Sequence, residues 1–236
     1  MNILVLLTDN GIDISSPAYP PFLSEIDGSP LIEHVIEQIL TIRNARYIFG
    51  IYQQHAKRHH LNEVIRLLVP DAKIFEIGNH TEGSVCTALL SWGYLDLEMP
   101  LIIISGNSLI KDDLNRILSD FRVRNLDGGV VVFRSIHPHF SYVKADSNYS
   151  IVEAADRRPI SQNACAEFYY FRTAKIFIEA AQDMIRKDAR SVGIFSMTPV
   201  YNQMLLRQMQ VGYYIIDKDS YIPPPSIWGR YSSEVV

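Results

Sequence analysis

Two polar segments of this sequence each follow a run of apolar residues, and such segments are where an α/β protein usually binds its ligand. Residues 8–23 follow the apolar run at 1–7, and residues 105–111 follow the apolar run at 100–104. In a doubly wound sheet, ligands bind outside the carboxyl ends of the strands, where the strand order reverses. The pattern therefore predicts a ligand site made by these two loops, in which any phosphate would be bound through local geometry.

Histidine and cysteine positions offer a second kind of chemistry. His55 and His59 are four residues apart, a spacing that places them on one face of a helix. Because no Cys or Glu accompanies them at ligand spacing, we expect a solvated helix start and not a metal site. Cys86 and Cys165 lie in apolar stretches far apart in the sequence, which predicts buried, reduced thiols.

The elements that position these residues follow from the hydrophobicity pattern. Short apolar runs indicate buried strands, and apolar residues three or four apart indicate helices with one buried face. Strands are predicted at residues 1–7, 46–52, 73–77, 100–104, 129–133 and 211–216, and helices at 31–42, 60–69, 83–95, 112–124, 173–186 and 199–209. This alternation is typical of right-handed βαβ units.

Three shorter segments, at residues 140–144, 151–153 and 164–172, are separated by polar turns and predict an antiparallel patch. No stretch rich in proline, glycine or serine divides the sequence into parts. We therefore expect a single domain at residues 1–236 with an α/β fold, a Rossmann-like doubly wound mixed sheet with a small β-rich insertion.

Charge and composition exclude several classes of protein. The 236 residues include 22 Lys plus Arg and 26 Asp plus Glu, which gives a formal net charge of −4. An acidic chain does not attract polyanions, which argues against binding to nucleic acid or to an anionic membrane. No apolar run reaches the length of about 18 residues that a membrane span needs, and no basic residue precedes Arg43. We expect a soluble, cytoplasmic protein.

Six segments together resemble the sugar-1-phosphate nucleotidylyltransferases, also called NDP-sugar pyrophosphorylases. They occur in that family's order, at residues 18–37, 81–89, 101–109, 141–144, 151–171 and 198–202. These enzymes join a nucleoside triphosphate to a sugar 1-phosphate and release pyrophosphate. The resemblance implies a fold of the nucleotide-diphospho-sugar transferase type, with a nucleotide-side half at residues 1–135 and a sugar-side half at 136–236. It also implies that the partner is a nucleotide or sugar phosphate and that the pathway is surface-polysaccharide biosynthesis.

On the nucleotide side, the resemblance implies two binding segments. Gly11 falls in the loop that binds the triphosphate in the family, and Gly83 falls where a glycine lets the base approach a helix N-terminus. Simpler roles stay open, because Gly11 can serve a turn with positive φ and residues 81–84 can form an ordinary helix cap. The residues assigned to nucleotide binding in this way are Thr8, Gly11, Thr81, Glu82, Gly83 and Ser84.

On the sugar side, the resemblance assigns sugar-phosphate binding to Asn107, Asp156, Arg157, Asn163 and Glu167. In the family an acid binds sugar hydroxyls and the adjacent base binds the phosphate, and Asp156 with Arg157 keeps an acid beside a base. An exposed charged turn is the alternative at this place. Glu167 stands near a position where the family carries a small residue, so its side chain is expected to reshape the sugar pocket.

Three positions depart from the family pattern. Asp13 stands where the family has an arginine for the leaving pyrophosphate, and Pro21 where it has a phosphate-bridging lysine. Asn107 or Ser108 occupies the position of the aspartate that holds Mg²⁺ in the family. Asn107 offers a metal only a neutral amide oxygen, so Mg²⁺ is expected as a cofactor only of an active enzyme.

The alternative to an active enzyme is a catalytically inactive homologue that binds sugar phosphate or serves as a partner or regulatory protein. A glycosyltransferase of similar shape is a third class, but residues 106–108 lack the D-x-D pattern that it would need. Residues 221–231 contain three prolines and several aromatics, and they predict an extended arm over the domain or over a neighbouring subunit of a homo-oligomer.

Overall fold

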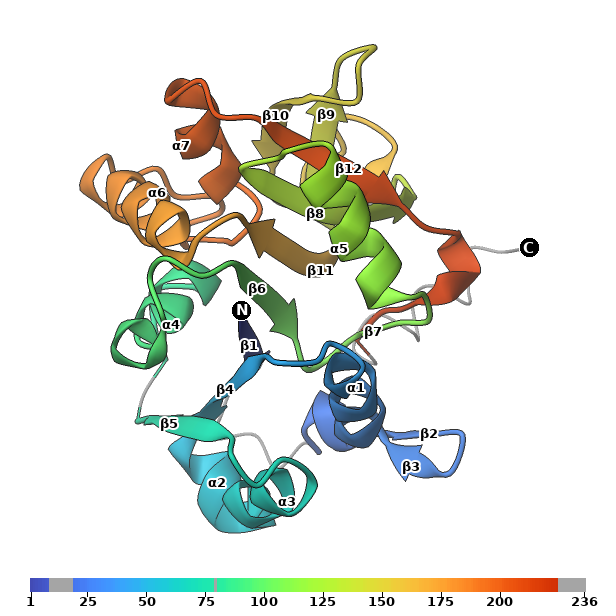
Figure 1. The fold of residues 1–236 in the computed structure, drawn as a ribbon, viewed down its shortest axis with the longest axis vertical. Helices are drawn as coiled ribbons and strands as arrows, with labels where there is room; N and C mark the ends of the chain where they lie inside the picture. The colour runs from blue at the N-terminus through green and yellow to red at the C-terminus, as the bar shows by residue number, and fades with distance from the viewer. Residues whose placement is uncertain (9–18, 79, 225–236) are drawn as a thin grey trace.

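A mixed sheet of nine strands runs through the molecule (Figure 1). The structure is a computed structural model, and it describes residues 1–8, 19–78 and 80–224. One half of the sheet is parallel and consists of β1 (Asn2–Leu7), β4 (Arg46–Tyr52), β5 (Lys73–Ile77) and β6 (Leu101–Ser105). Along the chain, β4 and then β5 are added on one side of β1, whereas β6 is added on the other side, so the strand order reverses between β1 and β6. This confirms the doubly wound arrangement.

The other half of the sheet is mainly antiparallel. β11 (Asn163–Phe171) pairs antiparallel with both β6 and β8 (Gly128–Arg134), and β12 (Val211–Ile215) pairs parallel with β8. The hairpin of β9 (Tyr142–Ala145) and β10 (Ile151–Ala155) continues from β11. The predicted β-rich insertion is therefore continuous with the main sheet.

Helices cover both faces of the sheet because the strands are apolar on both sides. In β1, Ile3, Val5 and Leu7 contribute to one core, and Leu4 and Leu6 contribute to the other. Figure 1 shows α1 and α5 on one side and α4 and α6 on the other. The first core is covered by α1 (Leu31–Leu40), α2 (Gln53–His59), α3 (Leu61–Leu68) and α5 (Leu114–Val123), and the second by α4 (Ser84–Leu89), α6 (Ala174–Arg186) and α7 (Val200–Leu206).

Two helices differ from the prediction for local reasons. The helix expected at residues 60–69 is confirmed as α3, but a further helix, α2, precedes it, and His60 separates the two with a left-handed conformation of φ 50°. The helix expected at 83–95 ends at Leu89 and is followed by a short 3₁₀ turn, η2 (Trp92–Tyr94). The Ser91 hydroxyl donates to the carbonyl of Ala88 at 2.6 Å, a local bond that competes with continuation of the helix.

Short strands complete the fold around the helices. β2 (Glu25–Ile26) and β3 (Ser29–Pro30) form a hairpin whose turn residues, Asp27 and Gly28, both have positive φ. β13 (Tyr221–Ile222) pairs with β7 (Leu109–Ile110), so the predicted arm begins beside the loop that follows β6. The rest of that arm, from residue 225, is outside the described residues. Among the helices of the described chain, none is long and apolar enough to cross a membrane.

Candidate functional site

The carboxyl ends of β1 and β6 lie side by side. The two strands pair in parallel, with Leu6 opposite Ser105. Beyond the strands, the Gly106 amide donates to the carbonyl of Leu6 at 2.9 Å. Asn107 Nδ2 donates to the carbonyl of Thr8 at 3.1 Å. These bonds join the starts of the two loops that the sequence predicts to bind a ligand.

The bond to Thr8 gives a physical reason for an amide at position 107. An asparagine can donate to a carbonyl oxygen, whereas an ionised aspartate cannot. Thr8 is 4% exposed and Asn107 is 6% exposed. Among the residues that the structure describes, the Thr8 hydroxyl and Asn107 Oδ1 have no hydrogen-bond partner. Because buried polar atoms normally have partners, these two atoms mark a place where a ligand atom would be stabilised.

Glu167 lies beside these strand ends because β11 runs antiparallel to β6. Phe168 pairs with Ile104, which places Glu167 next to Ser105. At this point β11 bulges: its register against β8 shifts, and Glu167 has a left-handed backbone with φ of 54°. Bulges of this kind redirect side chains and are common next to active sites.

The carboxyl group of Glu167 is held by serine hydroxyls. Ser108 Oγ donates to Glu167 Oε2 at 3.0 Å. Burial raises the pKa of Glu167, and the charge of Asp156 raises it further, while hydrogen bonds from Ser108 and Ser105 lower it. The site thus favours the protonated form of this acid more than water does.

Asp156 follows β10 and is also held by two serines. Ser141 Oγ donates to Asp156 Oδ1 and Ser196 Oγ donates to Asp156 Oδ2, each at 2.7 Å. Neither Asp156 nor Glu167 forms an ion pair with a cation elsewhere in the described chain. Two oriented carboxylates without a cation form a group of hydrogen-bond acceptors that suits a ligand rich in hydroxyls.

The predicted nucleotide segment 81–84 is joined to Asp156 by an irregular segment. The Phe195 amide donates to the carbonyl of Glu82 at 2.8 Å, and the next residue, Ser196, donates to Asp156. Gly83 has φ of 126°, and a Cβ at this position would lie 2.5 Å from the Phe195 carbonyl oxygen. The close neighbour of Gly83 is therefore the protein's own backbone, which requires a glycine here.

The polar side chains of this segment bond within the protein. The Thr81 hydroxyl donates to the carbonyl of Gly83 at 3.0 Å, and Glu82 pairs with Arg190 at 2.9 Å. Ser84 begins α4, for which Gly83 is the cap residue and no side chain serves as a cap. The alternative reading of this segment as an ordinary side-chain cap is wrong.

The remaining predicted residues fall into two groups. Arg157 is exposed, has φ of 50°, and forms no hydrogen bond or ion pair with the rest of the described chain. Asn163 is buried: its Oδ1 accepts from Arg134 Nη1 at 2.8 Å and its Nδ2 donates to the carbonyl of Val143 at 3.4 Å. Arg157 is thus free to meet a ligand, while Asn163 is engaged between strands. Gly11 lies outside the described residues.

The sequence placed Ser105 and Ser108 in a predicted ligand loop, but it did not identify any serine as a partner of Asp156 or Glu167. Ser105 and Ser108 directly follow a predicted strand, so their position at the strand end was a usable signal. Ser196 lies in a segment without periodicity, and only the fold shows that it faces Asp156. The serines that contact the two acids are Ser105, Ser108, Ser141 and Ser196.

The histidine and cysteine predictions are confirmed only in part. His55 and His59 do share one face of α2, with ring centroids 6.0 Å apart. The expected solvated helix start is wrong for His55, which is buried against Phe22. Burial, followed by the charges of His59 and Arg58, lowers the pKa of His55. Both cysteines are free, but Cys86 is only partly buried, whereas burial raises the pKa of Cys165 to about 12.

Comparisons with known proteins agree with this geometry. A model of the nucleotidyl transferase family matches residues 12–228. The chain belongs to this family. The structure of a nucleoside-diphosphate-sugar pyrophosphorylase from Vibrio cholerae RC9 is similar, with a TM-score of 0.77 and 16% identity over 99% of this chain and 100% of that chain. The inositol-1-phosphate CTP transferase from T. maritima gives a TM-score of 0.69 and 17% identity, with 95% and 90% covered.

At such identities the two solved structures show a common fold. No curated protein shows a significant match to the chain.

The described residues do not fit the magnesium ion that the resemblance implies. Within the described ranges, no three His, Cys, Asp or Glu side chains are grouped so that they could hold a metal. Asn107 offers only a neutral oxygen, and Asp156 and Glu167 already accept hydrogen bonds from serines. A hard divalent cation prefers several anionic oxygens. We therefore assign no chemical step to a metal at this site.

Gly83→Ala tests the contact with Phe195. We expect a loss of about 2–4 kcal/mol in the free energy of unfolding, because the new Cβ meets the backbone and the positive φ strains an L residue. Gly93→Ala is the matched control, since a Cβ there has no neighbour within 4 Å. Urea denaturation measures both, and equal stability of the two variants would contradict the assignment.

Glu167→Gln tests the environment of the buried acid. Because the pKa of Glu167 is raised in the folded protein, stability from this group is present below its ordinary pKa and is lost as pH rises through the raised value. The variant should therefore gain stability relative to the wild type as pH rises from about 4, the ordinary pKa of a glutamate, into the neutral range. Urea denaturation across this range measures the difference.

The exposed Glu98→Gln is the control for that series and should show no such trend. A Glu167→Gln difference that stays flat with pH would show that the carboxyl group ionises as it does in water.

Proposed function

We propose that this member of the nucleotidyl transferase family binds a sugar phosphate or nucleotide sugar at the carboxyl ends of β1 and β6, and that it acts as a binding or regulatory protein. The observation that carries the proposal is the pair Asp156 and Glu167, each oriented by serine hydroxyls at the point where the strand order reverses. Carboxylates in fixed positions accept hydrogen bonds from neighbouring sugar hydroxyls. The names of the similar proteins refer to a nucleoside-diphosphate sugar and to inositol 1-phosphate, both rich in hydroxyls.

Arg157 is the group that we assign to the phosphate. It follows Asp156 directly, is exposed, and has no partner among the described side chains. A guanidinium presents two parallel N–H groups that match two phosphate oxygens. An acid for the sugar and a base for the phosphate are therefore adjacent in the chain.

Two groups that activate a triphosphate in the family are replaced here by uncharged residues, and this favours ligand binding over nucleotidyl transfer. Pro21 replaces the phosphate-bridging lysine and is buried at the start of η1 (Pro21–Leu23), where it offers no charge. Asn107 uses its amide to hold Thr8. Phosphoryl transfer depends on cations that neutralise developing charge at the phosphates. At positions 21 and 107, where the family carries a cation or a metal-binding acid, this chain has uncharged residues.

Active nucleotidyl transfer is the second candidate function. Family membership and the unpartnered Thr8 hydroxyl and Asn107 Oδ1 favour it, since both atoms lie where a substrate would meet the ends of β1 and β6. Its product would be an activated sugar for surface-polysaccharide assembly.

Asp156→Asn tests the binding site. A charged acceptor is replaced by an amide, so affinity for the sugar 1-phosphate that the protein binds best should fall by about tenfold or more. Affinity is measured by calorimetric titration, after a thermal-shift screen of the common sugar 1-phosphates and nucleotide sugars. Asp71→Asn, an exposed acid in the turn before β5, is the control and should bind as the wild type does. Equal affinity of all three proteins would refute the role of Asp156.

A pyrophosphate-release assay separates the two functions. With Mg²⁺, each common nucleoside triphosphate is paired with each sugar 1-phosphate, and our proposal predicts no release above the rate without protein. Turnover that is lost in Asp156→Asn would replace the binding function with the transferase function. Ligand binding without turnover supports the binding function.

A further inference from the structure

Residues 196–202, which lead into α7, contact both strands that carry the acids of the proposed ligand site. β10 ends directly before Asp156, and β11 contains Glu167. The segment itself is held in the core, because Tyr201 is fully buried and its hydroxyl donates to the carbonyl of Gly129 in β8. A segment held in this way can fix the strands that it contacts.

The backbone of β11 is strained at Glu167. Its φ of 54° is a left-handed conformation, which is unfavourable for any residue other than glycine. The register of β11 against β8 shifts between Cys165 and Tyr169, so these two residues flank the bulge. Conformations of this kind persist only where the surrounding structure holds them. The contacts of Cys165 and Tyr169 therefore help to decide where the carboxyl group of Glu167 lies.

One hydroxyl group contacts both flanks of the bulge. Thr198 Oγ1 lies 3.0 Å from the Tyr169 hydroxyl, and the Thr198 side chain also forms a hydrogen bond with the Cys165 thiol. All three side chains are buried. Hydrogen bonds are electrostatically stronger in such a place than in water. Thr198 therefore ties the two flanks together, with Glu167 between them.

The same segment holds the strand that presents Asp156. β10 stands at the end of the strand order, and α7 lies beside it (Figure 1). Asn202 of α7 forms two hydrogen bonds with the backbone of Ala154: Oδ1 accepts from the amide at 2.9 Å, and Nδ2 donates to the carbonyl at 2.8 Å. Ser196, six residues earlier, donates to the carboxylate of Asp156. Asp156 is thus fixed through its side chain and through the backbone two residues before it.

We propose that residues 196–202 are the positioning element of the ligand site. Thr198 fixes the bulge that presents Glu167, and Asn202 fixes the strand end that presents Asp156. Both act through the acids and not by contact with the ligand. The inference rests on the proposed function, because it takes the two acids as the groups that bind the sugar. It adds that one segment, distant in sequence from both acids, determines the geometry of both.

Thr198→Val and Thr198→Ser test the first contact. Valine keeps the size of the side chain but removes the hydroxyl, so affinity should fall by about fivefold or more, whereas serine keeps the hydroxyl and should retain most of the affinity. The probe is glucose 1-phosphate, or the sugar 1-phosphate or nucleotide sugar that exceeds it in the thermal-shift screen. Calorimetric titration is done where every variant is fully folded, so that a loss of stability alone leaves the affinity unchanged.

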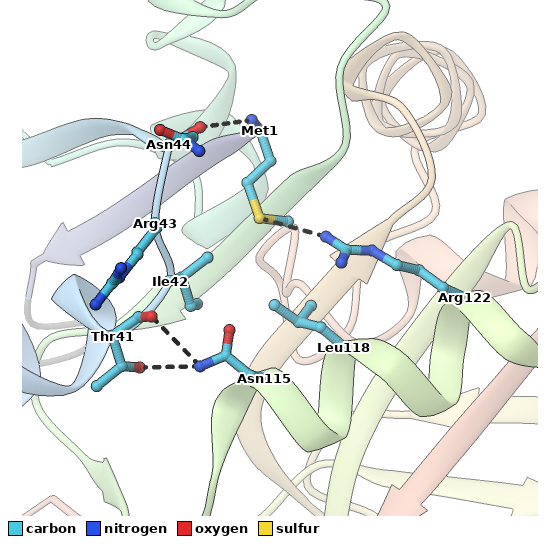
Figure 2. A pocket seen from close by; sticks show the side chains of 8 residues that line it. All are labelled: Met1, Thr41, Ile42, Arg43, Asn44, Asn115, Leu118 and Arg122. Atoms are coloured by element: carbon cyan, nitrogen blue, oxygen red, sulfur yellow. Dashed lines mark hydrogen bonds between the residues drawn. The ribbon is translucent and has the colours of Figure 1, made fainter.

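Thr41→Val is the matched control for this pair. Thr41 lines a hollow beside Met1, which precedes β1, whereas Thr8 of the ligand site follows the other end of that strand (Figure 2). The Thr41 hydroxyl donates to the carbonyl of Gln38 at 2.7 Å, so this variant also loses a hydrogen bond. It should bind as the wild type does.

Asn202→Ala tests the second contact, and since Asn202 is only partly buried, this variant serves even where the core does not tolerate Thr198→Val. Affinity should fall by about fivefold in the wild-type background and change little in Asp156→Asn, because the positioned acid is then absent. Asn115→Ala is the control: its Nδ2 lies 3.4 Å from the Thr41 carbonyl oxygen, far from the acids (Figure 2). Equal losses in both backgrounds would overturn the role of Asn202.

A measurement without ligand separates this inference from the proposed function. NMR titration of the Glu167 carboxyl carbon reports a pKa that burial and the charge of Asp156 raise. Thr198→Val should move this pKa back toward the ordinary value, since a loosened bulge admits water, and Thr198→Ser should not. If this change occurs but the wild type binds none of the probes, the proposed function fails and the positioning of Glu167 stands. If the wild type binds while Thr198→Val keeps both its affinity and its Glu167 titration, the positioning inference is overturned and the proposed function stands.

Discussion

Parallel pairing of β1 with β6 is the constraint on which the rest of this structure depends. It places Thr8 and Asn107, 99 residues apart in the chain, within hydrogen-bonding distance. It also gives β11 an edge to pair with, so that the bulge at Glu167 lies beside the same strand ends. Without the parallel pair, Asp156, Glu167 and the serines that contact them would have no common position. Helices on both faces keep the pair buried and dry.

The charges of Asp156 and Glu167 then determine which ligands can bind at these strand ends. Two carboxylates without a cation in the described chain are unfavourable unless hydrogen bonds, a proton or a ligand stabilises them. Serine hydroxyls supply the hydrogen bonds, and burial raises the pKa of Glu167, which favours its protonated form. A ligand rich in hydroxyls would add further hydrogen bonds without adding negative charge. A triphosphate would add negative charge at the same place, and the described side chains offer little to neutralise it.

Much of the architecture could be predicted from the sequence, because continuous apolar runs mark buried strands. The strands at Arg46–Tyr52 and Lys73–Ile77 have the predicted bounds. Prediction failed where a local interaction decides the outcome: the helix expected at residues 83–95 ends at Leu89, next to the hydrogen bond from the Ser91 hydroxyl to the carbonyl of Ala88. No periodicity reveals such a bond.

The candidate site could likewise be predicted from the sequence only in part. Glu167 and Asp156 could be chosen from the resemblance, but their serine partners come from three different segments that only the tertiary fold brings together. The role of Gly83 was predicted as an approach to a base, whereas the neighbour that requires a glycine is the backbone of Phe195. Residues close in space and far in sequence leave no signal in one sequence.

The central claim is that one ligand site is formed by the ends of β1, β6 and the bulge of β11. Hydrogen–deuterium exchange of the full-length protein, with and without the best-binding sugar 1-phosphate or nucleotide sugar, tests it most directly. Exchange should slow at residues 105–108, 165–168 and 194–197 when the ligand binds, with no change in α3. Protection confined to other segments, with these three unchanged, would contradict it.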